Sequence, residues 1–119
     1  MGRAIARRLQ GEGLRIELHD DHFAQGTPDA VWLPVVGKRG WIVLTKDTRI
    51  RYRPSEKQAL LGAGVRAFAF TSANLSGAQM GDAIVKALPR IMTILASHRR
   101  AFVARITATS DVAVLLVEK

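Results

Sequence analysis

The sequence predicts an α/β fold with three layers, in which helices cover both faces of a mainly parallel sheet. Three observations support this prediction. Apolar runs typical of buried strands alternate along the chain with segments of helical spacing. Gly and Pro residues separate these segments, and polar residues that favour helix starts precede several of them. The 119 residues contain no repeat or linker, so we expect residues 1–119 to form one domain.

The first part of the chain predicts two helices with a strand between them. Residues 2–10 are expected to form a short basic helix, and residues 14–18 alternate apolar and polar side chains as a half-buried strand does. Thr27 suits the N-cap of the next helix, which should end near residues 37–40. Pro34 falls inside this helix and is expected to kink or shorten it.

The middle of the chain continues the alternation. Residues 41–45 and 65–70 read as buried strands, and residues 54–61 between them read as a helix that opens on a proline. Ser76 is expected to cap a long helix, with Pro89 as a bend. The apolar residues at helical spacing in this helix are Met80, Ile84, Leu88, Ile91 and Leu95.

The chain ends with two further apolar runs, over residues 102–107 and 112–117. The polar residues 109–111 separate them, which is typical of a turn between strands. We expect either a terminal hairpin or two edge strands.

The charge balance favours a polyanionic partner. The chain has 18 Lys and Arg against 10 Asp and Glu, a formal charge of +8. Nucleic acid is the partner that fits best, while an anionic membrane surface or an acidic protein is the plainer alternative. The basic residues are spread along the chain, so we expect a folded basic face rather than a disordered arm.

The chain has no cysteine, which excludes disulfides and zinc–thiolate sites and fits a reducing compartment. Neither a signal-peptide pattern nor an apolar stretch long enough to cross a bilayer is present in the sequence. We therefore expect a soluble, cytoplasmic protein with no membrane partner.

Asp47 is the leading candidate for a functional residue. It follows the apolar run of residues 41–45, and Lys46 stands between them. A carboxylate at the carboxyl end of a buried strand lies where open α/β sheets build their sites. The alternative interpretation is a loop acid that caps the turn after the strand.

Arg49, Arg51 and Arg53 alternate with other residues directly after Asp47. In an extended segment they would lie on one side and, with Lys46, attract phosphate. The alternative is a solvated surface strip. An acid that holds a cation, next to bases that hold a polyanion, suggests phosphodiester chemistry.

Asp29 and Asn74 are the further candidates. Asp29 opens the helix after Thr27, so it could lie at the carboxyl edge of the sheet within reach of Asp47, or it could serve only the helix dipole. Asn74 follows the strand at 65–70 and could bind a metal-held water or shape the turn. Two acids and an amide would suffice for a loosely held Mg²⁺. The polar run 19–22, with two histidines, reads more simply as surface turn than as a metal site.

The order of these elements resembles the PIN-like nuclease families, and among them the VapC-like toxins of toxin–antitoxin systems. The likeness extends from Gly2 to about Leu95, and its most specific part is the combination of Thr45-Lys46-Asp47 with Thr27-Pro28-Asp29. The segments that carry the likeness are residues 19–23, 27–33, 40–47, 49–51 and 71–75.

The resemblance implies a PIN-type domain that cleaves RNA with Mg²⁺ or Mn²⁺ held by a cluster of acids. Asp29 would match the acid at the start of the family's second helix, and Asp47 would match the acid after the next strand. Asn74 would match the fourth position of the cluster. RNA is the implied substrate, and an antitoxin protein and a second copy of the chain are candidate partners.

The sequence departs from the family pattern at its start. PIN domains begin with a central strand that ends in the first metal-binding Asp, and no residue before Gly2 supplies it here. Ala30 also stands where many relatives carry a second acid. We expect an N-terminally truncated PIN-like fold, either because the true start lies upstream or because the chain is a non-catalytic remnant. The alternative function is a basic, non-catalytic module that binds RNA or an antitoxin.

Overall fold

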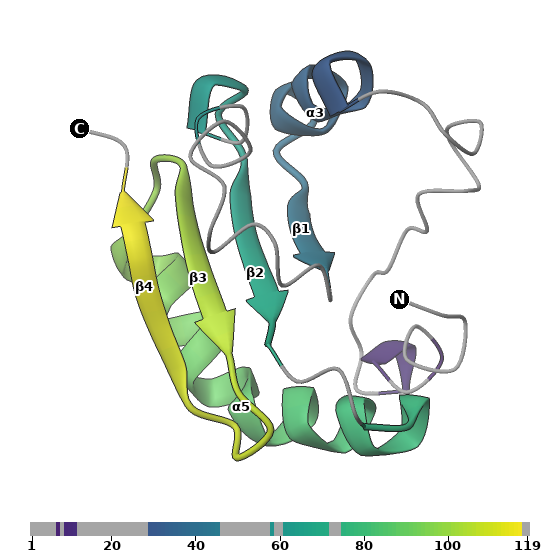
Figure 1. Cartoon of the computed structure of the whole chain (residues 1–119). Coiled ribbons are helices and arrows are strands. Elements are labelled where there is room, and N and C mark those ends of the chain that lie inside the picture. Colours follow the sequence, from purple (N-terminus) through teal and green to yellow (C-terminus); the bar gives the residue numbers. More distant parts are fainter. Residues whose placement is uncertain are drawn as a thin grey trace.

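The structure is a computed structural model that describes residues 7, 9–11, 29–45, 58, 61–71 and 75–117. The predicted helices over 2–10 and 54–61 fall largely outside these residues, and the predicted strand over 14–18 falls wholly outside them. Figure 1 shows the elements in chain order. They are α3 (Asp29–Lys38), β1 (Ile42–Thr45), β2 (Arg66–Phe70), α5 (Gly77–Ser97), β3 (Phe102–Ile106) and β4 (Val112–Val117).

The four strands form one sheet in the order β1-β2-β3-β4. β1 pairs with β2, and β2 with β3, in parallel, whereas β4 returns antiparallel to β3. These pairings confirm the prediction of an α/β fold with a mainly parallel sheet. They also resolve the last two predicted strands as a hairpin, in which β3 is an interior strand and β4 lies next to it.

Helix α3 ends in a Schellman motif, after which the chain turns and enters β1. The backbone N–H of Trp41 donates to the carbonyl of Val36, and that of Gly40 donates to Gly37, each at 3.1 Å. Gly40 has φ +69°, a conformation that glycine adopts at no steric cost. The Arg39 guanidinium lies 4.7 Å from the ring centroid of Trp41. The predicted end of this helix is thereby confirmed.

One face of the sheet is covered by α3. Leu33 and Val36 are buried against Val65, Ala67 and Val103. The helix continues through Pro34, which is exposed, so the predicted shortening does not occur. Trp32 and Trp41 are half-buried and pack against this cluster.

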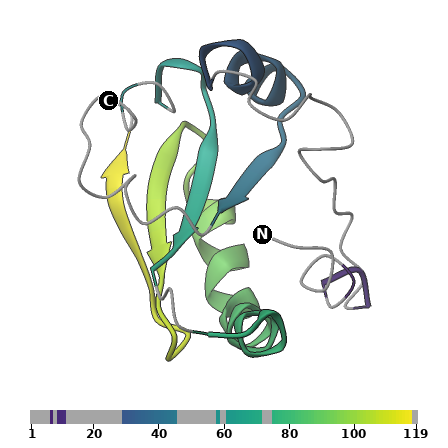
Figure 2. The same cartoon turned by 45° about the vertical axis from the view of Figure 1, so that its right-hand side comes forward.

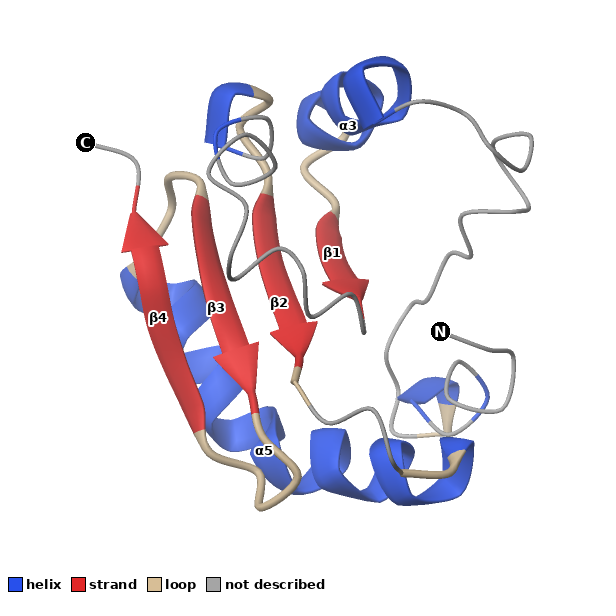
Figure 3. Cartoon of the chain, viewed as in Figure 1, coloured by secondary structure: helices blue, strands red, loops and turns tan. Residues whose placement is uncertain are grey.

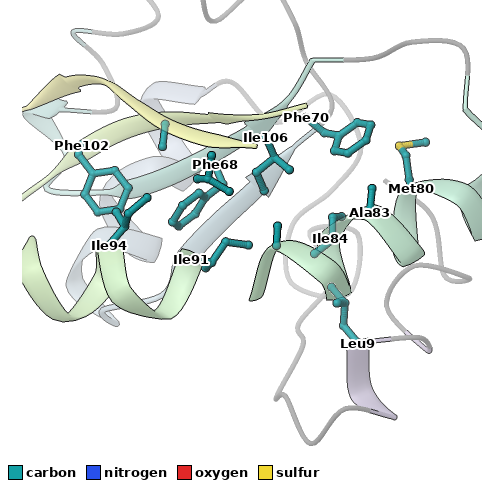
Figure 4. Close-up of a cluster of buried hydrophobic side chains, with 13 residues drawn as sticks. Leu9, Phe68, Phe70, Met80, Ala83, Ile84, Ile91, Ile94, Phe102 and Ile106 are labelled. Carbon is teal, nitrogen blue, oxygen red and sulfur yellow. The ribbon is translucent and has the colours of Figure 1, made fainter. Parts of the chain in front are cut away.

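The opposite face of the sheet is covered by α5. Figure 4 shows the side chains of this larger cluster, in which the rings of Phe68 and Phe102 meet edge to face with centroids 5.3 Å apart. Ala67 and Phe68 are neighbours in β2 and face opposite clusters, as strand alternation requires. Helices therefore lie on both faces, and the described part of the chain has the predicted three layers.

Side chains form hydrogen bonds with backbone groups at both ends of α5. Ser76 and Gln79 form a capping box, in which the Ser76 Oγ accepts from the Gln79 N–H at 3.2 Å and the Gln79 Oε1 accepts from the Ser76 N–H at 2.9 Å. At the other end, Arg66 donates to the carbonyls of Leu95 and His98, each at 3.4 Å. A cation at this end also complements the helix dipole. The predicted cap at Ser76 is confirmed.

The core side of α5 follows the predicted spacing. Met80, Ile84 and Ile91 are buried, while Leu88 and Leu95 are half-buried against the same cluster. The helix runs without a break through Pro89. Figures 1 and 2 show its first part passing beneath the ends of the strands and its second part rising along the sheet, which fits the predicted bend.

Gly37 allows a close approach that a larger residue would prevent. A Cβ at this position would overlap the carbonyl oxygen of Ala63, whereas a Cβ at Gly62 would meet nothing within 4 Å. Alanine favours a helix over glycine by about 1 kcal/mol when nothing opposes it. We therefore expect Gly37→Ala to destabilise the fold by about 1–3 kcal/mol, through a forced backbone shift.

The matched control is Gly62→Ala, which should leave stability unchanged or raise it by about 0.5–1 kcal/mol. Urea unfolding followed by circular dichroism measures both changes. Equal midpoints for the two variants would contradict the close approach at Gly37.

Candidate functional site

The carboxyl ends of β1, β2 and β3 meet at one edge of the sheet, because the three strands are parallel. Figure 3 shows their arrowheads on the same side. The strands end at Thr45, Phe70 and Ile106. This edge is where open α/β sheets place ligands, since successive loops leave the sheet there with their polar groups close together.

Thr71 extends β2 by one residue at this edge. Its backbone N–H donates to the Ile106 carbonyl at 3.0 Å, and its Oγ1 donates to the same oxygen at 3.3 Å. The edge of β2 is therefore tied to the edge of β3 beyond the last paired residues of the two strands.

The turn between β3 and β4 is fixed by side-chain hydrogen bonds. The Thr107 Oγ1 accepts from the Asp111 N–H, and the Thr109 Oγ1 donates to the Asp111 carboxylate, each at 3.1 Å. Ser110 has φ 69°, and its Oγ donates to the Ala83 carbonyl of α5 at 2.7 Å. The turn is thus fastened to the helix that passes beneath it.

A hollow of about 280 Å³ lies between this turn and the first half of α5. Its wall carries charged and polar side chains from the helix, including Asp82 and Lys86, and hydroxyl groups from the turn. The residues that line it are Leu75, Gln79, Asp82, Ala83, Lys86, Ala108, Thr109 and Ser110.

The structure places one of the predicted site residues. Asp29 is the first residue of α3, although its side chain is outside the described set. Figures 1 and 2 show α3 at the end of the sheet where β1 begins, away from the strands' carboxyl ends. This placement does not support the predicted closeness of Asp29 to Asp47, which stays a prediction that rests on the sequence alone.

The other predicted site residues lie outside the described residues. In the sequence, Asp47 follows the end of β1 by two positions, and Asn74 follows the end of β2 by four. The predicted phosphate-binding residues Lys46, Arg49, Arg51 and Arg53 and the polar run 19–22 are likewise outside. Within the part of the chain that the structure describes, no group of three or more His, Cys, Asp or Glu could hold a metal ion.

Arg105 is a candidate that the sequence reasoning missed. It is half-buried on β3, between two fully buried residues, Ala104 and Ile106. An arginine in the middle of an apolar run was the available signal. The expectation of a hairpin arm or an edge strand over residues 102–107 does not single it out, because a charged side chain on such a strand reaches solvent easily.

Among the described helices, none is long and apolar enough to cross a bilayer.

Comparison with known proteins assigns the family. The model of the family described as PIN like domain matches residues 1–72, which is more than half of the chain. The chain belongs to the PIN like domain family. The predicted resemblance to PIN-like nucleases is thereby confirmed, and the matched part of the domain contains α3, β1 and β2.

The chain is also similar to the protein named Putative ribonuclease VapC45, from Mycobacterium tuberculosis. The two chains are 26% identical over 91 residues, which is 73% of this chain and 66% of the relative. The match thus spans somewhat less than two thirds of that protein's own length. No solved structure matches the chain significantly.

The link between the β3–β4 turn and α5 can be tested at Ser110. Ser110→Ala removes the hydrogen bond to the Ala83 carbonyl, so we expect a loss of about 1 kcal/mol in the free energy of unfolding. Ser97→Ala is the matched control, since Ser97 is exposed at the end of α5, and it should change stability by less than about 0.5 kcal/mol. Thermal unfolding of both variants measures the difference. Identical melting temperatures would show that the bond contributes nothing.

Proposed function

We propose that this PIN-like domain is a metal-dependent endoribonuclease that acts as the toxin of a toxin–antitoxin system. The observation that carries the proposal is the parallel pairing of β1 with β2, with Thr45 opposite Ala69. The chain leaves both strands at one edge, shortly before Asp47 and Asn74. Family membership and the similarity to a protein named as a VapC ribonuclease support RNA as the substrate.

Asp47 and Asp29 are the proposed ligands of Mg²⁺ or Mn²⁺, and Asn74 assists them. Carboxylate and amide oxygens are the donors that such hard cations prefer, usually with waters completing the shell. When bound, the cation would activate a water and offset charge on the scissile phosphate. The Asp47 carboxylate itself would position the cation at the edge where the substrate's backbone arrives.

Lys46, Arg49, Arg51 and Arg53 are the proposed contacts to the RNA backbone. Their cationic groups would bind phosphates without reading the base sequence, as charge-assisted hydrogen bonds do. The surplus of 18 basic over 10 acidic residues supports this role. The proposal includes an antitoxin protein and a second copy of the chain as partners, a cytoplasmic location, and one domain over residues 1–119.

The expected first strand of the family, with its first acid, also stays a prediction. The DNA sequence upstream of the codon for Met1 tests it directly, because an in-frame apolar strand ending in Asp would confirm it.

The first functional prediction concerns Asp47. A chain that carries the expected first strand upstream of Met1 should cleave single-stranded RNA in Mg²⁺, lose this activity in chelator, and recover it with Mn²⁺. Asp47→Asn should lower the cleavage rate at least a hundredfold, because the amide lacks the charge that holds the cation. Asp82→Asn is the matched control, since Asp82 is an exposed acid on α5, and it should cleave at the wild-type rate.

Cleavage by Asp47→Asn at the rate of Asp82→Asn would refute the site assignment. Manganese binding, measured by electron paramagnetic resonance, gives a second reading that does not depend on turnover. Asp47→Asn should weaken it about tenfold or more, and Asp82→Asn should not.

The role of Asp29 is a separate prediction. If Asp29 is a ligand, Asp29→Asn should weaken manganese binding and RNA cleavage together. If it serves only the dipole of α3, the variant should keep both properties and lose about 0.5–1 kcal/mol of stability. Manganese titration and urea unfolding of the same protein separate the two results, and the second result would remove Asp29 from the site.

The alternative function is a non-catalytic basic module that binds RNA or an antitoxin. The charge of +8 favours it, since such a charge supports polyanion binding without any metal. This function predicts salt-sensitive RNA binding that chelator leaves unchanged and no cleavage under any metal condition.

A further inference from the structure

We propose that Arg105 binds a phosphate of the RNA backbone, on the face of the sheet that α3 covers. Arg105 pairs in register with Ala69 of β2 and with Ala113 of β4, and Ala69 pairs with Thr45 of β1. These residues form a row across the sheet, close to the carboxyl edge. Arg105 is the charged member of this row.

The face is fixed by alternation along the strands. Ala67 and Val103 pack against α3, and Ala69 and Arg105 lie two residues further along β2 and β3. Thr71 continues the same alternation at the edge. Beyond the residues that pack against α3, this face carries Arg105 on β3 and Thr71 after the end of β2.

The neighbours of Arg105 are too small to enclose it. Ala69 and Ala113 end at Cβ, so the arginine side chain extends past them on both sides. Ala69 is fully buried and Arg105 half-buried, which fits an aliphatic stem lying over apolar neighbours with its guanidinium reaching solvent. A packing role would explain the stem, whereas it would not require a charged head.

Among the described residues, no acid forms an ion pair with this guanidinium. Among the described acids, Asp111 is the nearest to Arg105 in the register of the hairpin. It lies opposite Thr107, two residues beyond Arg105, because its backbone carbonyl accepts from the Thr107 N–H. Its carboxylate instead accepts from the Thr109 hydroxyl at 3.1 Å. A guanidinium that reaches solvent with no described acid paired to it can bind an anion, and a phosphate that brings two oxygens is the partner that matches its two parallel N–H donors.

Arg105 would add a contact at a fixed position to the proposed RNA contacts. Arg105 stands on a strand paired on both sides, so its Cα is fixed relative to the edge where the parallel strands end. A phosphate held there would orient the RNA backbone across that edge. The inference rests on the proposed function only in taking RNA as the ligand, since it requires neither the metal nor cleavage.

RNA binding without turnover tests the inference. The full chain is titrated into a short fluorescein-labelled single-stranded RNA in chelator, and anisotropy gives the affinity at several salt concentrations. Arg105→Met should weaken binding about tenfold and lower the slope of log affinity against log salt by about 0.7, the value for one lost phosphate contact on a single strand. Arg90→Met is the matched control, since Arg90 is exposed on α5, and its affinity should stay within about twofold of wild type.

A second variant guards against an effect on folding. Arg105→Lys keeps the charge and the stem and loses the paired donors, so it should weaken binding several-fold with an unchanged salt slope. Circular dichroism melting confirms that each variant is folded, and if Arg105→Met is not, Arg105→Lys decides alone. Wild-type affinity in Arg105→Lys, or equal affinity in Arg105→Met and Arg90→Met, overturns the inference.

The outcomes for the two proposals are distinct. Cleavage that survives Asp47→Asn, together with weak RNA binding by Arg105→Met, refutes the metal site and supports the phosphate contact. Loss of cleavage in Asp47→Asn, together with full RNA binding by Arg105→Met, supports the metal site and refutes the phosphate contact.

Discussion

The parallel pairing of β1, β2 and β3 is the constraint on which the rest of the structure depends. Parallel neighbours cannot be joined by a tight turn, so the chain must leave each strand and cross back over a face of the sheet. Between β2 and β3 the crossing element is α5, which brings its own apolar face to cover the sheet. Because of the same pairing, the chain leaves each of these strands at the same edge of the sheet, and the candidate site is predicted at that edge.

The division of β2 into two faces shows how sequence and packing agree. Phe68 and Phe70 face α5 and carry the large cluster, whereas Ala67 and Ala69 face the other side. Small residues on that side allow α3 to sit close against the sheet at one end. At the other end they leave room for a long side chain on the neighbouring strand, and Arg105 occupies that position.

Much of the described fold could be predicted because its signals are local. The capping box at Ser76 and the glycine after α3 are read from adjacent residues, and the apolar spacing of α5 is read from one turn to the next. Pro34 is the exception, since α3 continues through it without being shortened. Pro34 is exposed, and packing of the residues around it outweighs one missing hydrogen bond.

The candidate site could be predicted only in part, for a different reason. A strand followed by Asp47 is a local pattern, and parallel pairing then places the end of that strand at the edge predicted for it. Arg105 depends on which residues face it across β2 and β4, which no single segment of sequence contains. Cross-strand register is set by the whole sheet, and a residue whose role comes from register looks like an ordinary charge in its own strand.

The proposed metal-binding acids and Arg105 have different geometric requirements. Mg²⁺ requires near-octahedral geometry but keeps several waters, so one or two carboxylates would suffice to hold it. A guanidinium that pairs with two phosphate oxygens needs a fixed direction, and an interior strand supplies one. Under the two proposals, Arg105 on β3 would set where the RNA backbone lies, while Asp47 and Asn74, after β1 and β2, would hold the cation that cleaves it. Both kinds of residue depend on the sheet edge, because strand pairing fixes the distance between Arg105 and the points where the chain leaves β1 and β2.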